Sequence, residues 1–276
     1  MKVAAIFLVL LFACAAIRAQ ESVPPVVDPL HKPFDEILDI YVRDGLVYYR
    51  ALKGERGKFD RYVQSLAETS ADTVKGWTPE RQLAFWINTY NALVLKTVID
   101  HYPIRGRARE YPANSIRQIP GAFERTTHRA GGRGFTLDTL EREVIAGFGD
   151  PRALFALSRG AMGGGRLKSE AFTSGRLDAQ LTTMTSELVT RRVLVFVDAA
   201  NGLLSVNPIF SWREAAFVKM ADQAKAVYDS RSPLERAVLA MIDPLLVPNE
   251  SEFLRKNTFR MVFHDFDWTL NDLTGR

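Results

Sequence analysis

A glycine-rich segment in the middle of the chain carries the residues best suited to chemistry. Between Ser158 and Glu170 the sequence holds four glycines within six residues, with basic residues on both sides. Glycine permits backbone conformations in which several amides point at one anion, and neighbouring cations strengthen the attraction. We therefore interpret this segment as a candidate anion-binding loop, made of Arg159, Gly163, Gly164, Gly165, Arg166, Ser169 and Glu170. The alternative is that the glycines only permit close backbone packing.

The glycine-rich segment is not a nucleotide-binding P-loop. That motif requires a contiguous Gly-Lys-Ser or Gly-Lys-Thr, whereas Arg166 and Leu167 separate Gly165 from Lys168 here. The anion that we expect is therefore a small molecule or an acidic glycan rather than a nucleotide.

A second hypothesis is a hydrolase of the cell envelope that uses neither a thiol nor a metal. Ser169 or a carboxylate would be its nucleophile, with Glu170 or His264 as the base. Neither Gly-x-Ser-x-Gly nor Ser-x-x-Lys occurs in the chain. No metal site and no cofactor are expected, because the histidines are scattered and no two are four residues apart: His31, His101, His128 and His264.

Asn88 and Asn91 lie three residues apart in an apolar stretch that has helical periodicity, so their amides share one face of a helix. A buried amide must be hydrogen-bonded, and most often it holds the backbone of a neighbouring loop. We expect this pair to tie the glycine-rich segment to the core, and we also keep both residues as candidate ligand contacts.

Hydrophobic periodicity predicts a mainly helical α+β protein. The longest apolar helix is expected over residues 78–102, because Thr78 and Pro79 form a good helix start. Residues 102–134 are expected to be irregular and rich in arginine. Further helices are predicted over 34–41, 59–66, 136–146, 174–190, 212–228 and 233–242. Strands are predicted over 193–198, 203–207 and 259–264, which gives a small, mainly antiparallel sheet in the second half.

Four segments of the chain resemble the motifs of the family called domain of unknown function 547. They are Ala84–Leu93 (AFWINTYNAL), Thr136–Glu141, Asp150–Leu157 and Asp267–Asn271. The resemblance covers nearly the whole chain after its first residues, but it implies no activity, because the family is defined without one.

The chain departs from the family at its most reactive positions. Many members carry histidines at the positions that match Arg142 and Leu154, and a cysteine or two followed by proline in the stretch that matches Arg159–Gly165. If that pattern is a thiol or metal centre in those members, this chain has lost it.

The first 19 residues read as a signal peptide that is removed on export. Their apolar run from Val3 to Ile17 is 15 residues long, shorter than the roughly 20 needed to span a membrane. A lipid anchor at Cys14 is the alternative to simple removal. We expect a flexible lead-in over 20–32 and a single globular domain over 33–276, which contains no cysteine.

Charge and composition constrain the partners. The formal charge of +4 falls to +2 without Lys2 and Arg18, so the net charge favours no particular partner. Seven arginines lie between Arg105 and Arg133, either as a solvated surface or as a face for anions. They lack the interleaved aromatic residues of a nucleic-acid interface, so nucleic acid is not an expected partner. The sequence favours an exported binding or structural module that recognises an anionic ligand.

Overall fold

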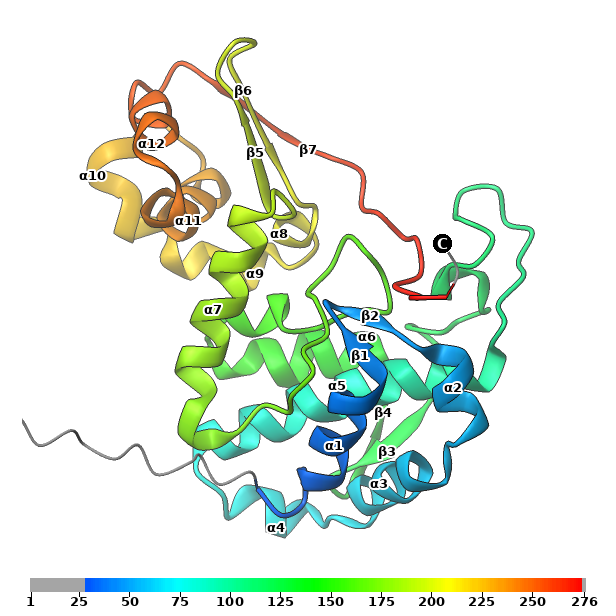
Figure 1. The fold of residues 1–276 in the computed structure, drawn as a ribbon. Helices are drawn as coiled ribbons and strands as arrows, with labels where there is room; N and C mark the ends of the chain where they lie inside the picture. The colour runs from blue at the N-terminus through cyan, green and yellow to red at the C-terminus, as the bar shows by residue number, and fades with distance from the viewer. Residues whose placement is uncertain (1–27, 275–276) are drawn as a thin grey trace, which may run out of the picture.

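The computed structural model describes residues 28–274, and its centre is the helix α5 (Pro79–His101). The Thr78 hydroxyl accepts a hydrogen bond from the Arg81 amide, and Pro79 occupies the first turn, which confirms the predicted helix start. Every residue from Leu83 to Leu95 is buried. A helix that is buried on all sides needs neighbours on all sides, and Figure 1 shows the other elements arranged around it.

The N-terminal elements cover one side of α5. They are α1 (Lys32–Tyr41), β1 (Val42–Arg43), β2 (Leu46–Val47), α2 (Tyr49–Gly54), α3 (Gly57–Glu68) and α4 (Ala71–Lys75). The antiparallel strands β1 and β2 are joined by Asp44 and Gly45, which both have positive φ angles of 51° and 82°. Such a two-residue turn matches the twist of a hairpin and projects the Asp44 side chain at its tip.

The prediction of a flexible lead-in over residues 20–32 is wrong for its last five residues, 28–32. Asp28 accepts a hydrogen bond from the Arg81 guanidinium at 2.6 Å. His31 is 2% exposed and lies 2.9 Å from the Tyr62 hydroxyl. Residues 28–32 are therefore part of the packed domain, because His31 fills a gap between α3 and α5. The predicted signal peptide and the rest of the lead-in lie outside the described residues.

The middle of the chain holds short elements around a π-helix. In order they are η1 (Ile116–Gln118), β3 (His128–Ala130), β4 (Arg133–Phe135), α6 (Leu137–Thr139), the π-helix η2 (Leu140–Ile145), η3 (Ala146–Phe148), η4 (Pro151–Phe155), η5 (Ser174–Arg176) and α7 (Leu177–Thr190). The predicted cap at Thr136 is confirmed. The expectation of an irregular stretch up to Gly134 was wrong from His128 on, since β3 and β4 form a hairpin closed by Gly131 and Gly132.

The second half contains a three-stranded sheet of β5 (Val195–Asp198), β6 (Leu203–Val206) and β7 (Arg260–Phe263). The predicted hairpin around Asn201 and Gly202 is confirmed by the β5–β6 pairing. The pairing of β6 with β7 is parallel, so this sheet is only half antiparallel. Strands also occur in the first half, because two short hairpins form there.

Helical segments fill the space beside this sheet. They are α8 (Ile209–Trp212), α9 (Glu214–Phe217), η6 (Val218–Ala224), α10 (Lys225–Tyr228), α11 (Pro233–Ile242), η7 (Asp243–Leu245) and α12 (Pro248–Arg255). The predicted helix over 212–228 is broken into short pieces, whereas the one over 233–242 is confirmed to the residue. Within residues 28–274, no helix combines the length and the apolar character required to span a bilayer.

Acid stability tests the packing of His31. Burial is the main cause that lowers its pKa to about 4; Asp28 opposes this shift and Arg81 adds to it. As the pH falls from about 6.5 to 4, the unfolded chain gains a proton that the native His31 does not, and the native state loses roughly 3 kcal/mol. His31→Gln should therefore reduce the loss of unfolding free energy between pH 7 and pH 4 by about that amount, as measured by urea unfolding.

The matched control for this experiment is His101→Gln, which changes an exposed histidine. The change in pH dependence should be larger in His31→Gln than in this control, because only His31 lies in the core. An unchanged pH dependence in His31→Gln would mean that His31 is not held neutral in the core.

Candidate anion-binding site

Two asparagine side chains join the core helix to the glycine-rich segment. The Asn91 amide donates to the Ala156 carbonyl at 3.0 Å, and its oxygen accepts from the Ser158 amide at 3.0 Å. The Asn88 amide pairs in the same way with both backbone groups of Phe172, at 2.9 Å each. The predicted role of these amides as ties to the core is therefore confirmed. Their hydrogen-bonding groups are directed at backbone, not at a cavity.

The glycines of the segment lie against other backbone. A Cβ at Gly165 would lie 1.8 Å from the Phe155 carbonyl oxygen, and one at Gly163 would lie 2.6 Å from the Asp267 amide nitrogen. At Gly164, the nearest backbone atom would be the Ser158 oxygen, at 3.2 Å. The Gly163 amide donates to the Asp267 carbonyl at 2.8 Å. Close backbone approach explains these glycines, so the expected convergence of their amides on an anion is not seen.

Arg159 faces the interior and not a ligand. Its side chain is 2% exposed, and its guanidinium pairs with Glu141 at 2.5 Å. It also donates to the carbonyls of Leu154 and Leu157 at 3.2 Å. Arg159 itself has a positive φ of 49°, and Gly160 follows it with a φ of 62°. These two residues turn the chain, and the turn directs the Arg159 side chain inward. The expectation that Arg159 and Arg166 form one anion site was therefore wrong.

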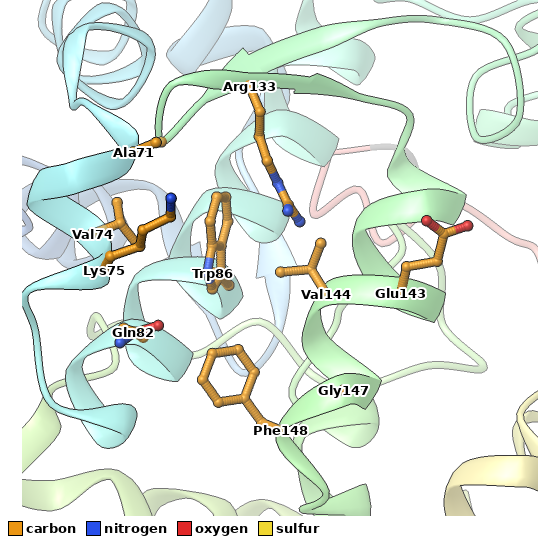
Figure 2. Close-up of a pocket in the computed structure, with 11 residues that line it drawn as sticks. Ala71, Val74, Lys75, Gln82, Trp86, Arg133, Glu143, Val144, Gly147 and Phe148 are labelled. Atoms are coloured by element: carbon orange, nitrogen blue, oxygen red, sulfur yellow. The ribbon is translucent and has the colours of Figure 1, made fainter.

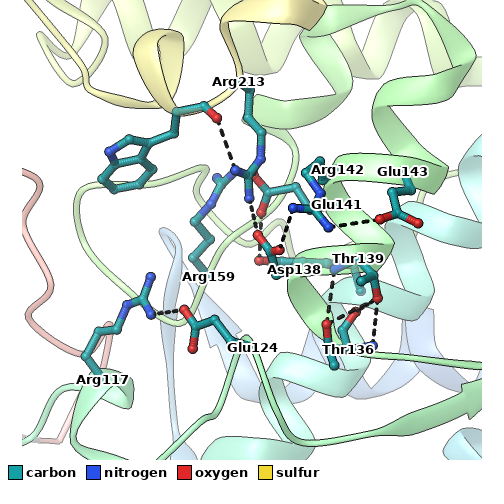
Figure 3. Close-up of polar contacts among 12 residues, drawn as sticks. Arg117, Glu124, Thr136, Asp138, Thr139, Glu141, Arg142, Glu143, Arg159 and Arg213 are labelled. Carbon is teal, nitrogen blue, oxygen red and sulfur yellow. Dashed lines mark hydrogen bonds and ion pairs between the residues drawn. The ribbon is translucent and has the colours of Figure 1, made fainter.

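Glu141 is the centre of a buried polar network (Figure 3). Besides Arg159, it accepts from the Arg213 Nε at 2.9 Å, and Figure 3 shows both arginines beside it. It also accepts from the Tyr90 hydroxyl at 3.2 Å. Arg213 also pairs with Asp138 at 2.8 Å. Burial by itself raises the pKa of Glu141, but the two guanidinium groups and the Tyr90 hydroxyl outweigh it, so the pKa lies below its usual value. The Glu141 carboxylate therefore stays charged. It acts as the ion-pair partner of Arg159 and Arg213, and it is a poor general acid because it carries no proton to donate.

Arg166 lies on the outer side of the same segment, beside a cavity of 290 Å³. Its side chain runs across Gly45, where a Cβ would come within 2.8 Å of the Arg166 Nε. Arg166 and Arg191 both pair with one oxygen of Asp44, at 2.6 and 3.1 Å. Two cations thus share one carboxylate at the edge of the cavity, while Met162 and Val193 form part of its apolar lining. This arrangement is the candidate anion-binding site.

The side chain of Asn271 fixes the turn that carries Asp44. The Asn271 amide donates to the Gly45 carbonyl at 2.9 Å, and its oxygen accepts from the Tyr49 hydroxyl at 2.7 Å. Asn271, in the C-terminal segment, therefore fixes the backbone of the β1–β2 turn. The two arginines pair with an aspartate on this fixed turn.

The residues of the hydrolase hypothesis do not come together. Ser169 is exposed, and within residues 28–274 no hydrogen bond joins it to a base. Glu170 instead pairs with Arg176 at 2.9 Å, and His264 contacts the Ser205 hydroxyl at 3.4 Å. A serine nucleophile needs its base within hydrogen-bonding distance. Among the described residues, no group of three or more His, Cys, Asp or Glu side chains could hold a metal ion.

A family model described as a protein of unknown function, DUF547, matches residues 74–189. Residues 74–189 belong to the DUF547 family. Comparison with curated proteins finds no match, and comparison with solved structures finds none either. The matched residues 74–189 contain the first three motif segments and leave out Asp267–Asn271. This last segment is hydrogen-bonded to Gly163, which lies within the matched residues.

The DUF547 resemblance also gives the Glu141 network a context. Arg159 and Glu141 both lie within the matched residues 74–189, and the Arg159 guanidinium fills the space beside Glu141.

Sequence reasoning missed Asp44 and Arg191. Asp44 could have been found, because Asp-Gly between short extended segments signals a tight hairpin with an exposed tip. Arg191 carries no such signal, because it lies just past the C-terminal end of α7, 147 residues along the chain from Asp44.

Removing one asparagine tests the ties between α5 and the glycine-rich segment. Asn91→Ala leaves the Ala156 carbonyl and the Ser158 amide buried without partners, which should lower the free energy of unfolding by about 2–4 kcal/mol in urea. Asn201→Ala, at the exposed tip of the β5–β6 hairpin, is the matched control and should change it by less than about 1 kcal/mol. Equal small losses in both variants would contradict the role of Asn91.

Removing Arg159 tests the buried network. Arg159→Leu should destabilise the protein at pH 7 by about 3–5 kcal/mol, because Glu141 keeps a buried charge with one cation fewer. The loss should be smaller near pH 4, where Glu141 of the variant can take up a proton. Adding Glu141→Gln should recover part of the stability at pH 7.

The control for the network is Arg142→Leu, since that side chain is 55% exposed. We expect a change of less than about 1 kcal/mol in urea unfolding. A loss in Arg159→Leu that is the same at pH 7 and pH 4 would show that Glu141 does not depend on Arg159.

Proposed function

We propose that this protein is an exported binding protein that recognises a small carboxylate- or phosphate-bearing molecule, such as an acidic sugar, at Arg166 and Arg191. The observation that carries this proposal is the sharing of one exposed carboxylate, that of Asp44, by both guanidinium groups at the edge of a 290 Å³ cavity. An arginine presents a planar fork that suits a carboxylate or a phosphate.

The charges around this cavity favour an added anion. Two arginines face one aspartate, so one positive charge is left without a partner within this group. The Asp44 carboxylate lies where both guanidinium groups can reach it, and we propose that the carboxylate or phosphate of a ligand takes this same position.

The Asp44 carboxylate is a displaceable competitor. Its side chain is 68% exposed, so it would return to water at little cost on release. Exposed ion pairs contribute only about 0.2–1 kcal/mol each. Arg166, in contrast, is 19% exposed and lies against Gly45, so its guanidinium is already positioned for binding.

The proposed location of the protein rests on its first residues. A short basic start, an apolar run of 15 residues and a small residue before a polar stretch are typical of an exported precursor. An exported protein of this kind meets acidic glycans and free phosphates outside the cytoplasm. A lipid anchor at Cys14 would hold the same domain at a membrane surface.

Removing Asp44 should improve binding. Asp44→Asn eliminates the internal competitor and should tighten the binding of inorganic phosphate or glucuronate by up to about tenfold. Arg166→Ala should weaken it by about 10- to 100-fold, because a charge-assisted hydrogen bond contributes roughly 1.5–3 kcal/mol. Isothermal titration calorimetry of each variant with both anions measures these changes and distinguishes the two ligand sources.

Arg260→Ala is the matched control, because this exposed arginine lies on β7 away from the cavity. It should bind both anions as the wild type does. Thermal unfolding without ligand shows whether each variant is folded. Binding that is unchanged in Arg166→Ala, or weaker in Asp44→Asn, would contradict the proposal.

A further inference from the structure

A second cavity lies against the central helix and shares no lining residue with the first. It has a volume of 380 Å³ and is bordered by α4, α5, the β3–β4 hairpin and η2. The indole of Trp86 forms its floor, and Val74, Val144 and Phe148 contribute apolar walls (Figure 2). Apolar walls, an aromatic surface and a few polar groups are the usual composition of a small-molecule site.

Two cations point toward the indole. The Arg133 guanidinium lies over the Trp86 ring, 5.2 Å from its centroid, and Figure 2 shows Lys75 directed toward the same ring from another side. Among the ion pairs within residues 28–274, none includes Lys75 or Arg133. Glu143, the acidic residue of this cavity, is 62% exposed and pairs with Arg142 at 2.9 Å. The positive charge of the cavity is therefore available to a ligand.

The side chains that line the cavity indicate the chemical class of the ligand. Apolar side chains make up much of the lining, notably Val144 and Phe148, and two basic side chains, Lys75 and Arg133, lie beside them. Trp86 is 5% exposed, so a flat apolar ring would pack mainly against Val144 and Phe148 and touch only the edge of the indole, while an attached anion reaches Lys75 and Arg133. We propose that this cavity binds an aromatic carboxylate. The inference is independent of the function proposed for Arg166.

Two glycines define the shape of the cavity. At Gly131, with a φ of +56°, a Cβ would lie 2.6 Å from the Trp86 ring, so glycine allows the β3–β4 turn to rest on the indole. At Gly147 a Cβ would meet nothing within 4 Å, and this residue lies in the short helix η3 without a positive φ. A side chain can therefore be added at Gly147 without displacing a neighbour.

The cavity continues along the hairpin. A neighbouring hollow of 630 Å³ shares Arg133, Glu143 and Val144 with it and adds the polar side chains of Thr127 and Thr139. The two hollows therefore adjoin each other at these shared residues, and the second one offers polar side chains to a substituent on the aromatic ring.

Calorimetric titration with 2-naphthoate tests the proposal. The uncharged 2-naphthamide should bind at least tenfold more weakly, because it does not pair with Lys75 and Arg133. Glucuronate, which has the charge but no aromatic ring, should also bind at least tenfold more weakly. Equal binding of the amide, or tighter binding of glucuronate, would overturn the assigned ligand class. No binding of 2-naphthoate at millimolar concentration would overturn the site.

Three variants separate this cavity from the Arg166 site. Gly147→Leu fills the cavity and should abolish 2-naphthoate binding while the thermal unfolding midpoint stays near the wild-type value. Arg133→Gln should weaken that binding by about three- to tenfold. Arg166→Ala should leave it unchanged, so that failure of one site is not mistaken for failure of the other. Naphthoate binding that survives in Gly147→Leu, or is lost in Arg166→Ala, would contradict the proposal.

Discussion

The requirement that buried amides be hydrogen-bonded is the constraint on which the rest of this structure depends. The central helix α5 is covered on all sides, yet it carries Asn88 and Asn91 in its buried middle. Each amide satisfies this requirement by pairing with both a backbone N–H and a backbone C=O of one crossing segment. Residues 156–158 and residue 172 are thereby held at fixed positions on the helix, and the glycine-rich segment between them is confined to the remaining space.

That confinement explains why two nearby arginines have opposite environments. Arg159 follows directly after the backbone held by Asn91, and its positive φ turns its side chain toward Glu141. Several residues later the chain has passed across the Phe155 carbonyl and the Asp267 backbone, and Arg166 emerges beside the β1–β2 turn. The first arginine neutralises a buried acid and stabilises the core. The second remains at a cavity edge, where its charge can meet a ligand.

The two cavities differ in how they hold positive charge. Arg166 and Arg191 are balanced in part by an internal carboxylate on a turn, so a ligand there has a competitor. Within residues 28–274, Lys75 and Arg133 share no such carboxylate, and the apolar walls beside them suit the aromatic carboxylate that we propose. Both cavities border elements that α5 positions, which connects the DUF547 segment to the two proposed sites. Arg133 also shows that the arginine-rich stretch contributes to a cavity as well as to the solvated surface.

The sequence by itself determined the elements whose signals are local. The cap at Thr78, the apolar periodicity of α5, the Thr136 cap and the Asn201-Gly202 hairpin were predictable, because each depends on residues within a turn or two of one another. The tie role of Asn88 and Asn91 was also predictable, since a buried amide needs a partner wherever the partner comes from. Only the tertiary structure decided that Arg159 pairs inward with Glu141, that Asp44 meets Arg166 and Arg191, and that β7 runs parallel to β6. These contacts join residues far apart in the chain, and one side chain can satisfy its charge with many partners, so the three-dimensional path of the backbone alone selects among them.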